Sequence, residues 1–268
     1  MKTSCAFAKL AAALLAGLFT SPLHAEQKPY EPILATSNRT GADDPDIKAT
    51  FDRLRKAVDE RDMKTIYDAL GKSFTAVTCK FDPLLDCRPG QKGLRQPSSK
   101  LTLIQRLERG LCCTDTPRAK ITKEITENAI LGQFSAALVA ETIGPHPDIA
   151  GLVCTPALPS FDRRKAARMV KAADILPIYL RVTEKDLPLR EKPQKDARLI
   201  ETLPAGSVVP LVAEMSSELP QNWNAISLPK GGLGYTDADG LNEIAAPALC
   251  LKREGPNSKI ALFIARED

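Results

Sequence analysis

The sequence predicts an α+β fold, in which a mainly helical, disulfide-braced N-terminal domain (44–175) is followed by a small β-barrel (176–247). Three observations predict this fold. Apolar residues recur at helical spacing up to Asp174. Short alternating apolar runs, separated by turn residues, follow that point. An even set of cysteines, most of them in the first region, is available for disulfides once a leader is removed.

Residues 1–25 have the layout of a secretory signal peptide. Lys2 gives a charged start, the stretch 10–19 is apolar, and small residues precede the expected cleavage between Ala25 and Glu26. Ten apolar residues are too few to span a bilayer, so a short membrane anchor is the weaker alternative. We therefore expect an exported chain, periplasmic or secreted, whose mature form has no transmembrane segment.

The charge and the histidine content exclude several classes of function. Without residues 1–25 the formal net charge falls from +4 to +2, which gives no reason to expect a nucleic-acid partner. A single histidine, His146, then remains. Zinc amidases of the usual kind need at least two histidines, and this class is excluded.

The first half of the N-terminal domain is predicted from helix-start signals. The proline-containing segment 26–43 is expected to be an extended or mobile arm, with order beginning at Asp44. Asp44 caps a first helix that has proline at its first position. Asp62 caps a shorter helix that ends at Gly71. The stretch 73–96 combines glycines, prolines and two cysteines, and we expect a disulfide-pinned loop there.

The second half of this domain is also expected to be largely helical. Ser99 is expected to cap a helix with apolar residues on one face. The segment 121–140 is ambiguous, because its last residues suit a helix or a strand equally. Ser160 is expected to cap a last helix that ends near Asp174.

The predicted barrel rests on four strand candidates, separated by proline and glycine turns, at 178–182, 198–203, 208–212 and 224–228. Several short strands separated by turn signals favour a closed β-structure. The tail (248–268) contains a predicted hairpin around 255–257, and Cys250 is placed to tie this hairpin to the body.

Six cysteines of the mature chain agree with export, because an oxidising compartment permits disulfides; they are Cys79, Cys87, Cys112, Cys113, Cys154 and Cys250. Six cysteines allow 15 pairings. The turn between Cys79 and Cys87 favours a bond between these two, whereas adjacent Cys112 and Cys113 are expected to reach different partners. A zinc site that includes His146 is the alternative, but paired C-x-x-C spacing is absent.

Four blocks of the C-terminal region resemble the pattern of bacterial SH3 (SH3b) domains. They follow the family's order and spacing, at 187–193, 199–209, 223–226 and 231–236. Leu187 and Leu189 stand where valines are usual, and Thr236 replaces a β-branched apolar residue. The resemblance covers about a quarter of the mature chain.

This resemblance implies an SH3-like β-barrel that binds cell-wall peptides or other proteins, or that supports a neighbouring domain. Trp223 and Tyr235 are the aromatic residues expected near a groove, and Arg190 lies at a strand end. These three are the candidate ligand-binding residues. The alternative for both aromatic residues is packing in the core.

The N-terminal half loosely resembles the uncharacterised helical region that precedes SH3b domains in some exported bacterial proteins. The likeness rests on 109–111, 153–157 and 161–162, and no chemistry is attached to it. A minor alternative is that 51–74 opens a cone of the nuclear transport factor type.

The sequence predicts no catalytic set. A cysteine peptidase needs a free thiolate beside a histidine base, but Cys112 and Cys113 are expected in disulfides. The G-x-S-x-G element of serine hydrolases is absent. Glycosidases need two carboxylates. Glu141 and Asp148 flank a loop, but nothing in their setting singles them out.

We therefore expect a non-enzymatic binding protein with no cofactor and no metal. Its SH3b-like domain is expected to engage peptidoglycan, a cell-wall peptide or a periplasmic protein. A cell-wall glycosidase that uses carboxylates of the helical domain is one alternative. An inhibitor or immunity-like protein is another, because a compact, disulfide-braced body suits it.

Overall fold

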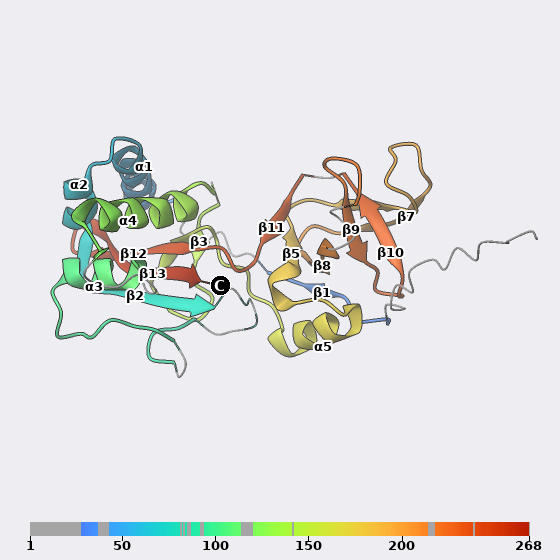
Figure 1. The fold of residues 1–268 in the computed structure, drawn as a ribbon, viewed down its shortest axis with the longest axis horizontal. Helices are drawn as coiled ribbons and strands as arrows, with labels where there is room; N and C mark the ends of the chain where they lie inside the picture. Colours follow the sequence, from blue (N-terminus) through green and yellow to red (C-terminus); the bar gives the residue numbers. More distant parts are fainter. Residues whose placement is uncertain are drawn as a thin grey trace, which may run out of the picture.

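The computed structural model describes residues 28–36, 43–80, 82, 84, 87–91, 94–113, 120–140, 142–213, 218–237 and 239–267. The signal peptide and its expected cleavage site lie outside these residues. The described chain forms two parts that lie side by side (Figure 1). We call them the α/β part and the two-sheet part. Among the described helices, none has the length and apolar character required to cross a membrane.

The α/β part consists of a five-stranded sheet with the strand order β2-β13-β12-β4-β3 and four helices. Its elements are α1 (Pro45–Asp59), α2 (Met63–Asp68), β2 (Leu70–Lys80), α3 (Leu103–Leu111), α4 (Lys123–Leu138), β3 (Gly144–Pro145), β4 (Val153–Thr155), β12 (Ala248–Glu254) and β13 (Asn257–Glu267). The helices pack on one face of this sheet, where Phe134 of α4 stacks on Phe263 of β13 with ring centroids 5.0 Å apart.

The prediction of a mainly helical N-terminal domain is wrong. The segment expected to begin a loop at residue 73 lies in β2, an eleven-residue strand. Strand β2 pairs in parallel with β13, so that Phe263 lies opposite Ala76. Its partner lies near the end of the chain, and a buried strand in a parallel pair lacks the simple alternation by which a strand is usually recognised.

Side-chain caps start the helices, but two of them differ from the expected residues. Asp44 accepts hydrogen bonds at the start of α1, and Asp62 does so at α2, as predicted. Helix α3 is capped three residues later than expected, by Thr102 in place of Ser99, and Thr102 forms a capping box with Gln105. The last helix, α5 (Arg163–Ala173), is capped by Asp162 in place of Ser160.

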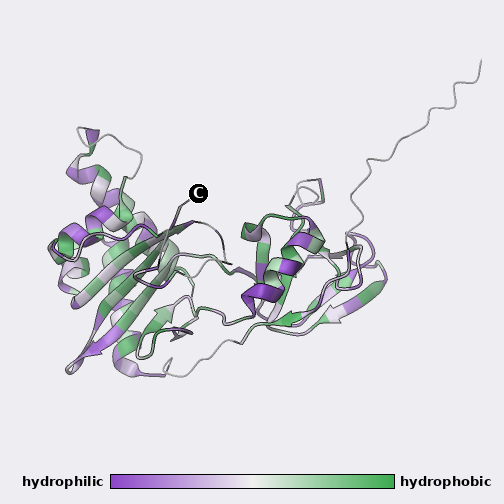
Figure 2. Ribbon diagram, turned by 90° about the horizontal axis from the view of Figure 1, so that it is seen from below, coloured by the Kyte–Doolittle hydropathy of each residue, from purple (hydrophilic) through white to green (hydrophobic). Residues whose placement is uncertain are grey.

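The C-terminal hairpin occupies the middle of the five-stranded sheet. Strand β12 pairs antiparallel with β13 on one side and with β4 on the other. The hairpin expected around 255–257 is therefore confirmed, but it contributes two central strands to the α/β part. Figure 2 shows hydrophobic residues concentrated along these strands, in agreement with their burial.

The two-sheet part contains two four-stranded sheets, with strand orders β1-β8-β5-β11 and β7-β6-β10-β9, together with α5 and a short 3₁₀ turn. Its other elements are β1 (Ile33–Leu34), η2 (Pro177–Tyr179), β5 (Leu180–Thr183), β6 (Leu187–Arg190), β7 (Leu199–Leu203), β8 (Ser207–Pro210), β9 (Asn224–Ser227), β10 (Leu233–Thr236) and β11 (Leu241–Glu243). Helix α5 packs against the first sheet, where Ala166 and Met169 join a core with Leu180 and Val208.

The described residues of the expected mobile arm are docked on the two-sheet part. Ile33 lies opposite Val208, which makes β1 an edge strand of the first sheet. The Tyr30 hydroxyl donates a 2.6 Å hydrogen bond to the carbonyl of Ser227, and burial, with Glu201 nearby, raises the pKa of this tyrosine. Apolar burial and strand pairing thus hold a segment whose prolines alone suggested mobility.

The six cysteines are placed in three pairs: Cys79 with Cys87, Cys154 with Cys250, and Cys112 with Cys113. The first pair is the expected one. Cys154 and Cys250 lie directly opposite each other in β4 and β12, with their Cα atoms 3.9 Å apart. Because Cys154 and Cys250 are bonded to each other, neither is available to Cys112 or Cys113. These two are bonded to each other, so the expectation that they reach different partners is wrong.

Disulfide mapping tests this connectivity. We expect non-reducing peptide mass spectrometry of the protein, purified without reductant, to recover the three pairs above and no others. Thiol titration of the unfolded, unreduced chain without residues 1–25 should give about zero free thiols, because its six cysteines are all paired. Recovery of Cys112 linked to Cys154 or Cys250 would contradict the structure.

The central position of the hairpin is tested by Phe263→Ala. This side chain is fully buried and stacks on Phe134, so its removal should lower the free energy of unfolding by about 3–5 kcal/mol. Denaturant unfolding of the full chain measures it. Leu176→Ala is the control, because Leu176 is 62% exposed and should change stability by no more than about 0.5 kcal/mol. Equal effects of the two substitutions would show that β13 is peripheral.

Candidate functional site

Arg190 and Tyr235, two of the three predicted ligand-binding residues, are neighbours in the second sheet. They lie opposite each other in β6 and β10. Tyr235 also lies opposite Ala225 of β9, and Arg190 lies opposite Leu199 of β7. Since residues opposite each other in paired strands share a face, these four form one row across the sheet.

The row is partly accessible. Leu199 is 49% exposed, and both Arg190 and Tyr235 are half-buried. The Arg190 guanidinium donates a 2.8 Å hydrogen bond from Nη1 to the carbonyl of Ala197, which orients it within the sheet. A partly exposed arginine beside a tyrosine is a suitable contact for a peptide.

Trp223, the third predicted residue, is largely buried. It immediately precedes β9 and is only 9% exposed. Its backbone N–H donates to the carbonyl of Pro220, which closes the turn before the strand. The side chain can therefore offer little surface to a ligand, and its burial agrees with the alternative of core packing.

A larger feature was not predicted: a cleft of about 850 Å³ lined by residues from both parts. The described lining residues are Ala35, Ala136, Val139, Ala140, Thr142, Pro156, Ala157, Pro159, Val182, Thr183, Glu184, Ala205, Gly206, Asn242, Glu243, Ala246 and Pro247. Small-molecule and cofactor sites commonly have volumes of about 300–1,000 Å³ and often lie between domains. The cleft therefore has the size of a ligand site.

The chemistry of the cleft is set by small side chains and carboxylates. Among its described lining residues, Glu184 and Glu243 are the charged ones, and both are exposed. Glu243 lies 3.4 Å from the guanidinium group of Arg181. Burial lowers the pKa of this arginine. Alanines, prolines and a glycine form most of the remaining wall. A narrow ligand that carries a positive charge would fit this lining.

One wall of the cleft includes a sheet edge. Strand β11 pairs with β5 and ends the first sheet, and its Asn242 and Glu243 line the cleft. In Figure 1, β11 lies on the side of the two-sheet part nearest the α/β part. An edge strand presents backbone N–H and C=O groups that an added extended segment can pair with.

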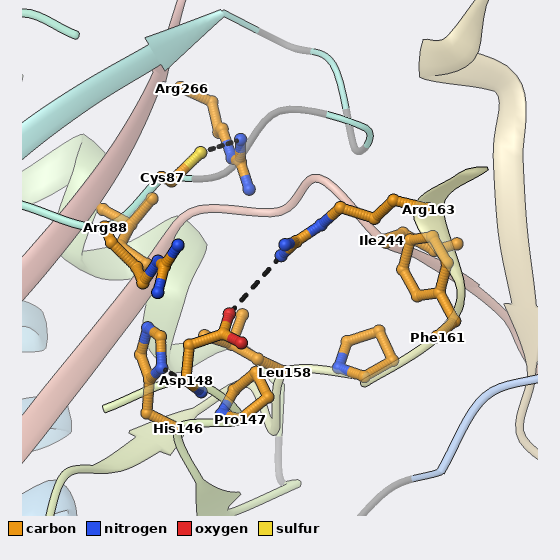
Figure 3. A pocket seen from close by; sticks show the side chains of 12 residues that line it. Cys87, Arg88, His146, Pro147, Asp148, Leu158, Phe161, Arg163, Ile244 and Arg266 are labelled. Carbon is orange, nitrogen blue, oxygen red and sulfur yellow. Dashed lines mark hydrogen bonds and ion pairs between the residues drawn. The ribbon is translucent and has the colours of Figure 1, made fainter. Parts of the chain in front are cut away.

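His146 and Asp148, which the sequence offers as candidates for catalysis, line a smaller pocket (Figure 3). His146 is 8% exposed, and its Nδ1 accepts 3.1 Å hydrogen bonds from the backbone N–H groups of Asp148 and Ile149. Asp148 forms an ion pair with Arg163 at 3.6 Å. The histidine therefore stabilises a turn, and Nδ1 is not available as a base. Glu141 lies outside the described residues.

The residues of the described chain contain no cluster of three or more histidines, cysteines or acids arranged to hold a metal ion. Comparisons of the chain with protein-family models, with curated proteins and with solved structures find no match. The function is therefore argued from the sites themselves.

The role of His146 can be tested by NMR. Because Nδ1 accepts two hydrogen bonds, we expect the neutral tautomer that carries its proton on Nε2, as seen in long-range ¹H–¹⁵N correlation spectra. The variant His146→Ala leaves two backbone donors without their acceptor and should lower the free energy of unfolding by about 1–3 kcal/mol. A ring protonated at Nδ1 in the folded protein would contradict this arrangement.

Proposed function

We propose that this chain is an exported, non-enzymatic binding protein that holds an extended peptide, from the cell wall or from a partner protein, in the cleft between its two parts. The observation that carries the proposal is the 850 Å³ cleft, whose described lining combines small side chains, two carboxylates and an edge strand. The likeness of 187–236 to SH3b domains supports a peptide as the ligand class, since that family implies cell-wall peptides or proteins.

The charges of the cleft indicate the sign of the ligand. Glu184 would attract an ammonium or guanidinium group, and a peptide with a free side-chain amine supplies one; Glu243 adds negative charge to the cleft but also pairs with Arg181. The backbone groups at the edge of β11 would pair with the peptide's main chain, which requires no particular sequence. Backbone pairing would supply affinity, and the glutamates would select a ligand with a positive charge. This combination suits a repetitive polymer such as peptidoglycan.

The side chains considered for catalysis support binding more than chemistry. The cysteines are paired with one another, and Nδ1 of His146 accepts two backbone hydrogen bonds. Asp148 is engaged by Arg163. The glycosidase and inhibitor alternatives stay predictions; the two glutamates of the cleft belong to the two-sheet part, whereas the glycosidase alternative uses carboxylates of the N-terminal domain.

Retention of the full mature chain on purified peptidoglycan tests the proposal. Val139→Arg places a long side chain in the cleft at a position that is 79% exposed, so the fold should tolerate it. We expect retention to weaken about tenfold or more, which corresponds to about 1.4 kcal/mol. Leu176→Arg is the matched control, because Leu176 is 62% exposed and lies outside the cleft lining.

A second pair of variants tests the charge. Glu184→Gln should weaken retention at low salt, whereas Glu218→Gln, an exposed change outside the cleft lining, should not. Equal retention of all four variants and the unaltered chain would reject the cleft as the binding site. Release of reducing ends from the peptidoglycan during incubation would instead support the glycosidase alternative.

A further inference from the structure

The smaller pocket lies where five segments of the chain meet. Cys87, which is bonded to Cys79, and the adjacent Arg88 form one of them, and residues 146–148 form the turn held by His146. The approach to α5 and the end of β13 complete the wall, with Ile244 beside them. The pocket has a volume of about 40 Å³, which is room for a few water molecules or for one small polar group.

The described lining of this pocket carries more positive than negative charge. Figure 3 shows the guanidinium groups of Arg88, Arg163 and Arg266, with the carboxylate of Asp148, around the same space. Asp148 forms an ion pair with Arg163 at 3.6 Å, and the side chains of Asp148 and Arg163 are 33% and 39% exposed. Outside the lining, Asp82 attracts Arg266. One lining carboxylate faces three guanidinium groups.

Arg266 is the most constrained of the three. Its Nη1 donates to Sγ of Cys87 at 2.9 Å and to the carbonyl of Lys80 at 3.4 Å. Its Nε–H is buried and has no hydrogen-bond partner in the described chain. Burial, opposed by the charge of Asp82 and assisted by the charge of Arg163, lowers the pKa of Arg266 to about 10. A half-buried cation whose contacts are a sulfur atom and a long carbonyl bond lacks a strong acceptor.

We propose that this pocket binds the carboxylate group of a small organic acid or of a peptide C-terminus, held by the guanidinium groups of Arg163 and Arg266. A planar carboxylate matches the fork of an arginine side chain and accepts charge-assisted hydrogen bonds from it. Six other lining residues are apolar and suit the carbon chain that carries such a carboxylate; they are Pro147, Leu158, Pro159, Phe161, Ile244 and Ile264.

This site differs from the cleft in both charge and lining. Pro159 lines both spaces, and no other residue is common to the two linings. The cleft selects a cation by its glutamates, whereas the pocket selects an anion by its arginines. The inference therefore does not depend on the proposed function, and either can fail without the other.

Calorimetric titration of the full mature chain tests the carboxylate site. The probes are propionate, N-acetyl-alanyl-alanine with a free C-terminus, the C-terminal amide of the same dipeptide, and inorganic phosphate. We expect saturable binding of at least one free acid and at least tenfold weaker binding of the amide. Binding of the dipeptide acid alone identifies a peptide C-terminus, and binding of propionate as well identifies a general organic-acid site.

Variants tie the binding to the named residues. Arg163→Gln should weaken acid binding at least tenfold, and Arg266→Lys should also weaken it because a lysine keeps the charge but loses the fork. Arg168→Gln on the same helix is the control, since Arg168 is 66% exposed and outside the pocket lining. Thermal melts verify folding, and Arg163→Gln alone decides if Arg266→Lys does not fold.

Three outcomes would overturn the proposal. Acid and amide binding equally well would show that the carboxylate is not recognised. Unchanged binding in Arg163→Gln would place the ligand elsewhere. Binding of phosphate with no binding of either acid would show that the pocket selects a tetrahedral anion and not a planar carboxylate.

Discussion

The parallel pairing of β13 with β2 is the interaction on which the arrangement of the whole chain depends. The two strands lie side by side in one sheet, although β2 is near the start of the α/β part and β13 ends the chain. Everything between them forms the connection. The two-sheet part lies within that connection, because the chain leaves the five-stranded sheet after β4 and returns to it at β12.

This connectivity holds the two parts together by more than a single linker. The chain passes from the α/β part to α5 and returns through the segment after β11. The arm adds a third link, because β1 pairs with β8 before the chain enters α1. The cleft lies among these links, since Ala35 of the arm, Ala157 after β4 and Ala246 before β12 all line it. A site between the two parts is thus a consequence of the chain connectivity.

The sequence predicted the features that depend on residues close together in the chain, and it failed for features that depend on distant residues. Local signals worked where the determinant is local: Asp44 and Asp62 cap their helices, and the strands expected in the C-terminal region correspond to β5, β7, β8 and β9. They failed for β2, whose partner is distant in sequence, and for the arm, whose order comes from contacts with β8 and Ser227. The pairing of Cys154 with Cys250 also depends on strand register, which no spacing rule reveals.

The candidate sites divide in the same way. Arg190 and Tyr235 belong to one stretch with a family likeness, and the structure places them opposite each other. The cleft is lined mostly by alanines, prolines and other small residues from six separate stretches, and its two glutamates resemble ordinary surface residues in the sequence. The three arginines of the pocket are equally dispersed and resemble ordinary surface residues in the sequence.

The shared wall of the cleft and the pocket determines which substitutions can separate them. Pro159 contacts both spaces, and Asp162, three residues later, caps α5 immediately before Arg163. A change within 156–162 would therefore alter both sites and the start of the helix together. Val139 and Glu184 contact only the cleft, and Arg266 contacts only the pocket. Substitutions at these positions can distinguish a protein that binds a cationic peptide, one that binds a carboxylate, and one that binds both groups.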